Sequence, residues 1–138
     1  MVSTKAHPDQ ASSERQARSA TVCVIDDDAS LLRALQRLLV ADGFTVAVFP
    51  SAEVFLESER VHTADCLVLD VHLGGMSGFE LHDRLVAAGT RVPVVFITAH
   101  DDGPTRERAQ RAGAVAYLRK PFDDESLIGA IHKALGRS

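Results

Sequence analysis

The 138 residues predict one domain with a single hydrophobic core. The composition, 46% hydrophobic and 25% charged, is typical of a soluble globular protein, and a net charge of −4 argues against direct nucleic-acid binding. No apolar run has transmembrane length and the N-terminus lacks the apolar core of a signal peptide, so we expect a cytoplasmic protein with no membrane partner.

Residues 1–20 are polar and show no sustained apolar period, which predicts a flexible N-terminal tail before a folded domain at residues 21–138. The two cysteines, Cys23 and Cys66, lie inside apolar runs. We interpret them as small buried hydrophobic side chains in a reducing compartment rather than as disulfide partners.

From Thr21 onward, strand patterns alternate with helix patterns. Strands are predicted at residues 21–26, 44–49, 66–70, 92–97 and 115–118. A leucine stripe at residues 31–39 predicts the first helix, which Gly43 ends, and Pro50 and Ser51 begin a short second helix. The third helix runs from Ser77 to Gly89, the fourth from Pro104 to Gly113, and the fifth begins after Asp123 or Asp124.

The apolar positions of these helices predict which sides face the core. In the second helix we expect Val54 and Phe55 to point inward, and the third helix carries the apolar residues Phe79, Leu81, Leu85 and Val86. Ser77 and Glu80 form the sequence of a capping box at the start of the third helix.

Five strands that alternate strictly with five helices predict parallel strands joined by right-handed crossovers. The fold class is therefore α/β: a doubly wound five-stranded parallel sheet between two helical layers, in a flavodoxin-like (βα)5 three-layer sandwich.

Polar side chains follow four of the predicted strands. Asp26 and Asp27 follow the first, Asp70 the third, Thr98 the fourth and Lys120 the fifth. A lone aspartate at such a place usually caps the next turn, but the repetition favours a site, because parallel strands end at one edge of the sheet. At ~4 Å and an effective dielectric of ~20, each pair of carboxylates costs about 4 kcal/mol, so the site needs a cation. Oxygen ligands favour Mg²⁺ or Mn²⁺.

Taken together, four segments resemble the response-regulator receiver domain, the phosphoryl-accepting module of two-component signalling. They are residues 24–28 (VIDDD), 69–78 (LDVHLGGMSG), 97–100 (ITAH) and 120–122 (KPF), and the resemblance spans about residues 22–135. Residues 50–56 (PSAEVFL) are most similar to the receivers of nitrogen-fixation-type regulators, which usually carry a helix-turn-helix output domain.

The resemblance implies an acceptor and its metal site. Asp70 matches the phosphoacceptor, Asp27 the direct metal ligand and Asp26 its partner, while the backbone carbonyl of His72 matches the main-chain metal ligand. The metal would be Mg²⁺ or Mn²⁺. Asp28 we interpret as a helix N-terminal residue rather than as a ligand.

The resemblance also implies catalytic and switch residues. Lys120 matches the cation that pairs with Asp70 and then with the phosphoryl group, and Thr98 the hydroxyl that binds this group in the active state. Tyr117 matches the aromatic switch residue on the fifth strand. The resemblance further implies a cis Lys120–Pro121 peptide bond.

This chain departs from the family beside the acceptor. The common Met-Pro pair is Leu73-Gly74 here, and histidines stand two positions after Asp70 and after Thr98, at His72 and His100. We interpret these histidines as modulators of dephosphorylation that restrict the attacking water. A metal site built from both histidines and the aspartates is an alternative that we favour less.

The implied function is a phosphorylation switch rather than an enzyme, although it catalyses its own phosphorylation and dephosphorylation. The donor would be a histidine kinase or phosphotransfer protein. An effector or a second copy would bind the surface of the fourth helix, the fifth strand and the fifth helix. The arginine stripe on the fourth helix, at Arg106, Arg108 and Arg111, is either part of that surface or a solvated face.

Two further functions remain as alternatives. In the first, the chain would be the receiver part of a DNA-binding transcriptional regulator whose output domain is absent here. An end close after the last predicted helix favours a stand-alone receiver instead. A more distant alternative is a small Mg²⁺-dependent phosphatase. Such an enzyme would need an acid two residues after its nucleophile, and His72 occupies that position.

Overall fold

The computed structural model describes residues 19–137, so the predicted tail at residues 1–20 lies almost wholly outside the described residues. The strands are β1 (Thr21–Ile25), β2 (Thr45–Phe49), β3 (Cys66–Asp70), β4 (Val94–Thr98) and β5 (Ala116–Arg119). The helices are α2 (Ala29–Ala41), α3 (Ala52–Leu56), α4 (Gly78–Ala87), α5 (Gly103–Arg111) and α6 (Asp124–Ala134), with a 3₁₀ helix at Glu59–His62. Among the described residues, no helix is both long enough and apolar enough to span a membrane.

The five strands form one parallel sheet in the order β2-β1-β3-β4-β5, which confirms the predicted doubly wound topology. The strand that ends in Asp70, β3, is central and pairs with β1 and β4, with Leu69 opposite Ile25 and Asp70 opposite Ile97. All five residues of β3 and of β4 are buried, as expected of strands covered on both faces. The carboxyl ends of β1, β3 and β4 therefore meet at one edge.

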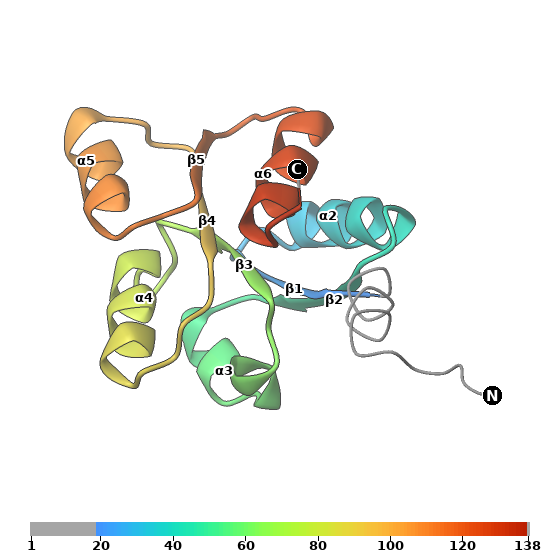
Figure 1. The fold of residues 1–138 in the computed structure, drawn as a ribbon. Helices are drawn as coiled ribbons and strands as arrows, with labels where there is room; N and C mark the ends of the chain where they lie inside the picture. Colours follow the sequence, from blue (N-terminus) through green and yellow to red (C-terminus); the bar gives the residue numbers. More distant parts are fainter. Residues whose placement is uncertain (1–18, 138) are drawn as a thin grey trace.

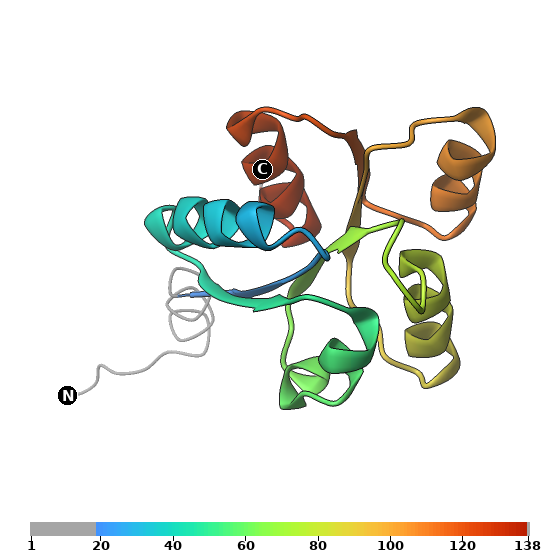
Figure 2. The same ribbon diagram turned by 180° about the vertical axis from the view of Figure 1, so that it is seen from behind.

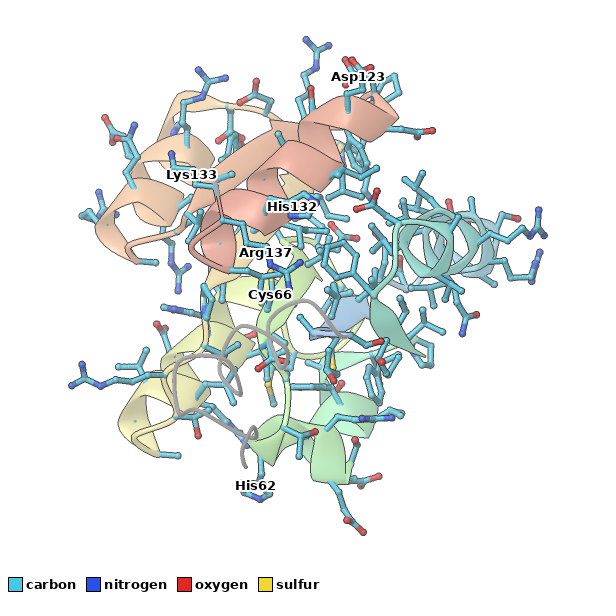
Figure 3. All side chains as sticks on the ribbon, turned by 45° about the vertical axis from the view of Figure 1, so that its right-hand side comes forward. His62, Cys66, Asp123, His132, Lys133 and Arg137 are labelled. Carbon is cyan, nitrogen blue, oxygen red and sulfur yellow. The ribbon has the colours of Figure 1, made fainter. Side chains whose placement is uncertain are left out.

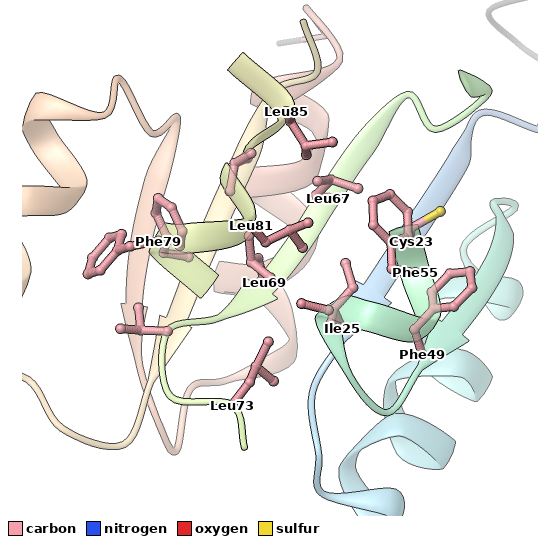
Figure 4. Packing of buried hydrophobic residues seen from close by; sticks show 14 of the residues in the cluster. Cys23, Ile25, Phe49, Phe55, Leu67, Leu69, Leu73, Phe79, Leu81 and Leu85 are labelled. Atoms are coloured by element: carbon pink, nitrogen blue, oxygen red, sulfur yellow. The ribbon is translucent and has the colours of Figure 1, made fainter. Parts of the chain in front are cut away.

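Helices cover both faces of the sheet, and the two helical layers can be followed in Figures 1 and 2. On one face α3, α4 and α5 pack against alternate strand residues that include Ile25, Leu69 and Phe96. Figure 4 shows this core, in which Leu81 and Leu85 of α4 lie beside Leu67 and Leu69 of β3. On the opposite face α2 and α6 pack against the other set of alternate strand residues. The sheet is thus the middle layer of three.

Short polar side chains begin the helices as the sequence predicts. Asp28 caps α2 by accepting hydrogen bonds from the amides of Ser30 and Leu31, so its role as a helix N-terminal residue is confirmed. Ser77 and Glu80 form the complete capping box of α4. The cis peptide bond predicted between Lys120 and Pro121 is also present.

One predicted core position is wrong, because Val54 is 44% exposed. Val86, an apolar residue of α4, is also exposed, at 60%. Successive residues of an α-helix are turned by about 100°, so each of these valines points away from its buried neighbour, Phe55 in α3 and Leu85 in α4. Apolar character alone placed Val54 in the core, whereas the helical period assigns it to the surface.

The two cysteines are buried and free, as predicted, and they pack on opposite faces of the sheet, which excludes a disulfide between them. At the C-terminal end of α6, visible in Figure 3, the Nε2 atom of His132 lies 3.1 Å from an oxygen of Asp42. The His132 ring also lies 5.4 Å from that of Phe44. These contacts attach the end of α6 to the turn after α2.

Gly78, the first residue of α4, lies directly against the end of β3. A β-carbon at this position would overlap the main-chain oxygen of Asp70. Gly74, in the same loop, has no neighbour within 4 Å of its hypothetical β-carbon.

We expect Gly78→Ala to lower the free energy of unfolding by about 1–3 kcal/mol, because the backbone must move apart to admit the methyl group. Gly74→Ala is the matched control and should change it by less than about 1 kcal/mol. Urea unfolding monitored by circular dichroism measures both variants. Equal losses would show that the contact between α4 and β3 is not tight.

Candidate functional site

Three carboxylates meet at the carboxyl edge of the sheet. Asp26 follows β1 and is completely buried, Asp70 ends β3 and is 4% exposed, and Asp27 is exposed at the rim. One oxygen from each of the three lies within 4.8 Å of the others. Within residues 19–137 this is the one group of three or more such side chains that could hold a metal ion. Oxygen donors alone form a set that suits a hard divalent cation, so these residues fit the predicted Mg²⁺ or Mn²⁺.

Lys120 brings a positive charge to this edge from the end of β5. Its Nζ atom lies 2.7 Å from Oδ2 of Asp26 and 3.4 Å from Oδ2 of Asp70. Burial lowers the pKa of Lys120, but the hydrogen bond to Asp26 and the negative charges of Asp70 and Asp26 outweigh it, and the pKa is raised. Lys120 is therefore a charged bridge between the two carboxylates.

Backbone amides hold the remaining oxygens of the two buried carboxylates. Oδ1 of Asp26 accepts a hydrogen bond from the Asp28 amide at 2.9 Å, and Oδ1 of Asp70 accepts one from the His72 amide at 3.1 Å. Every buried side-chain polar atom among the described residues has a hydrogen-bond partner. Each carboxylate thus has one oxygen fixed by the main chain and the other directed at Lys120.

Burial raises the pKa of Asp70 to about 6, and the negative charge of Asp26 adds to this rise. The charge of Lys120 and the hydrogen bond from the His72 amide act in the opposite direction without reversing it. Without a second cation, the folded protein therefore holds Asp70 as an unfavourable negative charge at neutral pH.

Thr98 ends β4 and is completely buried. Its hydroxyl forms a local turn with His100, accepting a hydrogen bond from the His100 amide at 2.9 Å and donating one to the His100 carbonyl at 3.3 Å. The Thr98 carbonyl accepts a hydrogen bond from the Lys120 amide at 2.7 Å, which joins the ends of β4 and β5.

The two predicted modulators lie together. The rings of His72 and His100 meet edge to face, with centroids 4.8 Å apart and planes at 86°, and both side chains are exposed. Neither histidine belongs to a group of three metal-binding side chains among the described residues. The arrangement therefore gives no support to the alternative metal site of histidines and aspartates.

Tyr117 interacts with a carboxylate other than the three described above. Its hydroxyl donates a hydrogen bond to Asp101 at 3.2 Å, and the guanidinium of Arg106 lies 5.6 Å from its ring centroid. The sequence analysis missed Asp101, because an aspartate just before a helix is usually a capping residue. In α5 the capping residue is Asp102.

The arginine stripe of α5 is not simply solvated. Arg106 pairs with Asp101, and Arg108 pairs with Asp83 of α4 while its guanidinium lies 4.6 Å from the ring centroid of Phe79. Sequence reasoning also missed Glu53 of α3, which accepts a hydrogen bond from the Met76 amide at 3.0 Å and so supports the loop after Asp70.

The raised pKa of Asp70 predicts a pH-dependent gain of stability for Asp70→Asn in the presence of EDTA. Between about pH 4 and pH 6 the folded wild type holds a proton that the unfolded chain releases, so its stability relative to the uncharged variant falls as pH rises through this window. At pH 7.5 the variant should be more stable by about 1–3 kcal/mol. Urea unfolding at pH 4 and pH 7.5 measures the difference. Asp27→Asn, an exposed control, should show less gain, and an equal gain would contradict the assignment.

Comparison with known proteins gives the family. The model of the response regulator receiver domain matches residues 22–132. Response regulator protein TodT from Pseudomonas putida is 40% identical over 118 residues, which are 86% of this chain and 52% of that protein. Transcriptional regulatory protein FixJ from Azorhizobium caulinodans is 40% identical over 120 residues, 87% of this chain and 57% of that protein. The chain thus spans about half the length of these curated relatives.

A solved structure agrees with this result. The crystal structure of a response regulator receiver protein from Burkholderia phymatum is 45% identical, with a TM-score of 0.76, and the similarity covers 87% of this chain and 98% of that one. The match of FixJ, among others, confirms the predicted likeness to nitrogen-fixation-type regulators. The chain belongs to the response-regulator receiver domain family of two-component signalling.

Proposed function

We propose that this chain is a phosphoryl-accepting switch in which Asp70 takes a phosphoryl group from a phosphohistidine of a histidine kinase or phosphotransfer protein. The observation that carries the proposal is the setting of Asp70. It is buried at the tip of the central strand, with one oxygen fixed by the His72 amide and the other facing Lys120. A carboxylate held in this way is a positioned nucleophile.

In the transfer, an oxygen of Asp70 attacks the phosphorus atom in line with the bond to the histidine nitrogen. That bond breaks, its electron pair returns to the imidazole, and an acyl phosphate forms on Asp70. Asp26, Asp27, Asp70 and the backbone carbonyl of His72 would hold Mg²⁺ or Mn²⁺, which supplies neutralisation of charge on the phosphoryl oxygens when bound. Lys120 adds a second positive charge from its place between Asp26 and Asp70.

The donor would approach the site beside Lys120. An open groove of about 420 Å³ is bordered by the start of α2 and by the loop between β5 and α6. Its lining includes Leu31, Pro121 and Phe122, next to the ammonium group. An apolar groove that ends at the site suits a helix of the donor protein that presents its phosphohistidine.

After transfer, Thr98 would turn its hydroxyl from the His100 carbonyl to the phosphoryl group, and Tyr117 would turn inward. The surface of α5, β5 and α6 would then change, and an effector or a second copy of the chain would bind there. Phosphorylation shifts this equilibrium only by its different contacts in the two arrangements.

A second candidate is the receiver part of a longer transcriptional regulator. The relatives support it, since FixJ is named a transcriptional regulatory protein and this chain matches 57% of its length. In that case the same phosphorylation would control a DNA-binding output domain. The receiver itself, with its net charge of −4, would still make no direct contact with nucleic acid.

Phosphorylation at Asp70 is directly testable. With acetyl phosphate and Mg²⁺, intact-mass spectrometry should show one added phosphoryl group, and EDTA should abolish the addition because the carboxylates then repel the incoming dianion. Asp70→Asn should remain unmodified. Asp65→Asn, at the opposite end of β3, is the matched control and should be phosphorylated like the wild type. Modification of Asp70→Asn would refute the assignment of the acceptor.

The paired histidines predict a slow loss of the phosphoryl group. His72 and His100 follow Asp70 and Thr98 by two positions and their rings contact each other, so we propose that they border the path of the attacking water. An imidazole cannot orient water as a carboxamide or carboxylate does. We expect His72→Asn and His100→Glu each to accelerate phosphate release by about two- to tenfold, equivalent to about 0.4–1.4 kcal/mol in the barrier.

The release of inorganic phosphate from the isolated phosphoprotein gives these rates. His62→Asn is the control, because His62 is exposed and points away from the body of the molecule in Figure 3. If neither of the two substitutions near the site accelerates release, the histidines do not restrict the water.

A further inference from the structure

Tyr117 of β5 forms a network with two other side chains, those of Asp101 and Arg106. Its hydroxyl donates to Oδ1 of Asp101 at 3.2 Å. The other oxygen of Asp101 pairs with the guanidinium of Arg106 at 2.6 Å, and that guanidinium lies 5.6 Å from the Tyr117 ring centroid. The three side chains therefore form a closed triangle that fixes the phenol at both its hydroxyl and its ring.

Asp101 belongs to the segment that leaves the phosphoacceptor site. It stands three residues after Thr98, whose hydroxyl closes the local turn with His100. The same short segment thus carries both the hydroxyl predicted to bind the phosphoryl group and the carboxylate that binds Tyr117. A change in the Thr98 turn must move the residues that follow it.

We propose that Asp101 is a positioning residue that holds Tyr117 in the position seen in the structure and releases it when the Thr98 hydroxyl leaves His100. The inference rests on the proposed phosphorylation of Asp70 and assigns a role to a residue outside that site. Arg106 pairs with the same carboxylate, and Asp101 connects this pair with the segment that follows Thr98.

The exposure of the two charged partners supports this division. The side chain of Asp101 is 15% exposed, whereas that of Arg106 is 56% exposed. An exposed arginine keeps most of its freedom, and an exposed ion pair contributes little by itself. The carboxylate, by contrast, is largely removed from water and has two partners. Its loss leaves the tyrosine hydroxyl without its acceptor.

The sheet register decides on which face of the sheet the Tyr117 side chain lies. Tyr117 is opposite Phe96 of β4, so its side chain emerges on the face of the sheet that carries α3, α4 and α5, and it packs partly against that core. Inward rotation therefore needs no change of strand register. The hydrogen bond to Asp101 favours the position of Tyr117 seen in the structure, and its removal should raise the population of the rotated side chain.

The composition supplies a specific probe. Tyr117 is the one tyrosine in the sequence and there is no tryptophan, so ultraviolet titration and tyrosine fluorescence report this residue alone. Burial raises the pKa of Tyr117, and the charge of Asp101 and its hydrogen bond raise it further. Arg106 acts in the opposite direction, and the more distant Asp102 adds to the rise.

The experiment compares wild type with Asp101→Ala, Asp101→Asn and Asp83→Ala. Asp83 is the matched control because it also pairs with an arginine of α5, Arg108, but does not contact Tyr117. We expect Asp101→Ala to lower the pKa of Tyr117. We also expect it to speed phosphorylation by acetyl phosphate by about three- to tenfold, a typical size for coupling between two sites. Asp101→Asn, which keeps an acceptor oxygen, should fall between wild type and Asp101→Ala.

A double substitution separates positioning from general loosening. In a Tyr117→Phe background, which lacks the hydroxyl, Asp101→Ala should no longer speed phosphorylation. An unchanged tyrosine titration in Asp101→Ala, or an equal acceleration with and without the hydroxyl, would overturn the inference. So would an effect of Asp83→Ala as large as that of Asp101→Ala.

A failure of the proposed function would give a different experimental result from a failure of the inference about Asp101. If wild type and all variants remain unmodified by acetyl phosphate, the assignment of Asp70 fails, and the inferred release, which depends on it, fails as well. If the wild type is phosphorylated but Asp101→Ala has the wild-type rate and the wild-type titration, the inference about Asp101 fails alone.

Discussion

Lys120 joins the end of β5 to the ends of β1 and β3, two strands with which β5 shares no backbone ladder. It extends from the end of β5 and contacts Asp26 after β1 and Asp70 at the end of β3, although β4 separates β5 from β3. Two carboxylates buried this deeply would be strongly unfavourable without a positive partner. The geometry of the whole carboxyl edge therefore depends on one ammonium group.

That group neutralises the edge only in part. Three carboxylates against one ammonium leave a formal charge of about two minus in a small volume. Burial and the negative charge of Asp26 keep the pKa of Asp70 raised despite Lys120. The remaining negative charge would favour a divalent cation, and in the proposed function that cation would allow a phosphoryl group to approach an edge that otherwise repels it. The unfavourable charge of the folded protein would then be the source of the binding property.

Whether the structural role of a residue could be predicted from the sequence depended on which part of the structure determines its contacts. The strands and the charged residues after them follow from local pattern, because a buried parallel strand is apolar throughout and ends where polarity returns. Asp26, Asp70 and Lys120 could therefore be brought together before any coordinates were known. Helix caps such as Ser77 were equally accessible, since a cap interacts with its own next turn.

Side chains whose contacts lie in loops, away from the strand ends, were not accessible in this way. Val54 was misplaced because hydrophobicity was followed where the helical angle decides burial. Asp101 was missed because it pairs from a loop with a residue 16 positions away, and Glu53 because it accepts from the amide of a loop residue 23 positions away. Such pairs depend on how the loops are arranged over the sheet, and the local sequence pattern does not predict that arrangement.

The contrast between strand ends and loops has a functional consequence. Main-chain hydrogen bonds tie the strand ends together, from the Val71 amide to Ile97 and from the Lys120 amide to Thr98. The loops that follow are held instead by single side chains, among them Asp101 and Glu53. A phosphoryl group added at Asp70, as proposed above, would therefore meet a rigid frame in the strand ends and weaker side-chain contacts in the loops. Because a few side-chain hydrogen bonds are far weaker than a sheet ladder, the response to such a phosphorylation should be confined to the loops and the surface that they support.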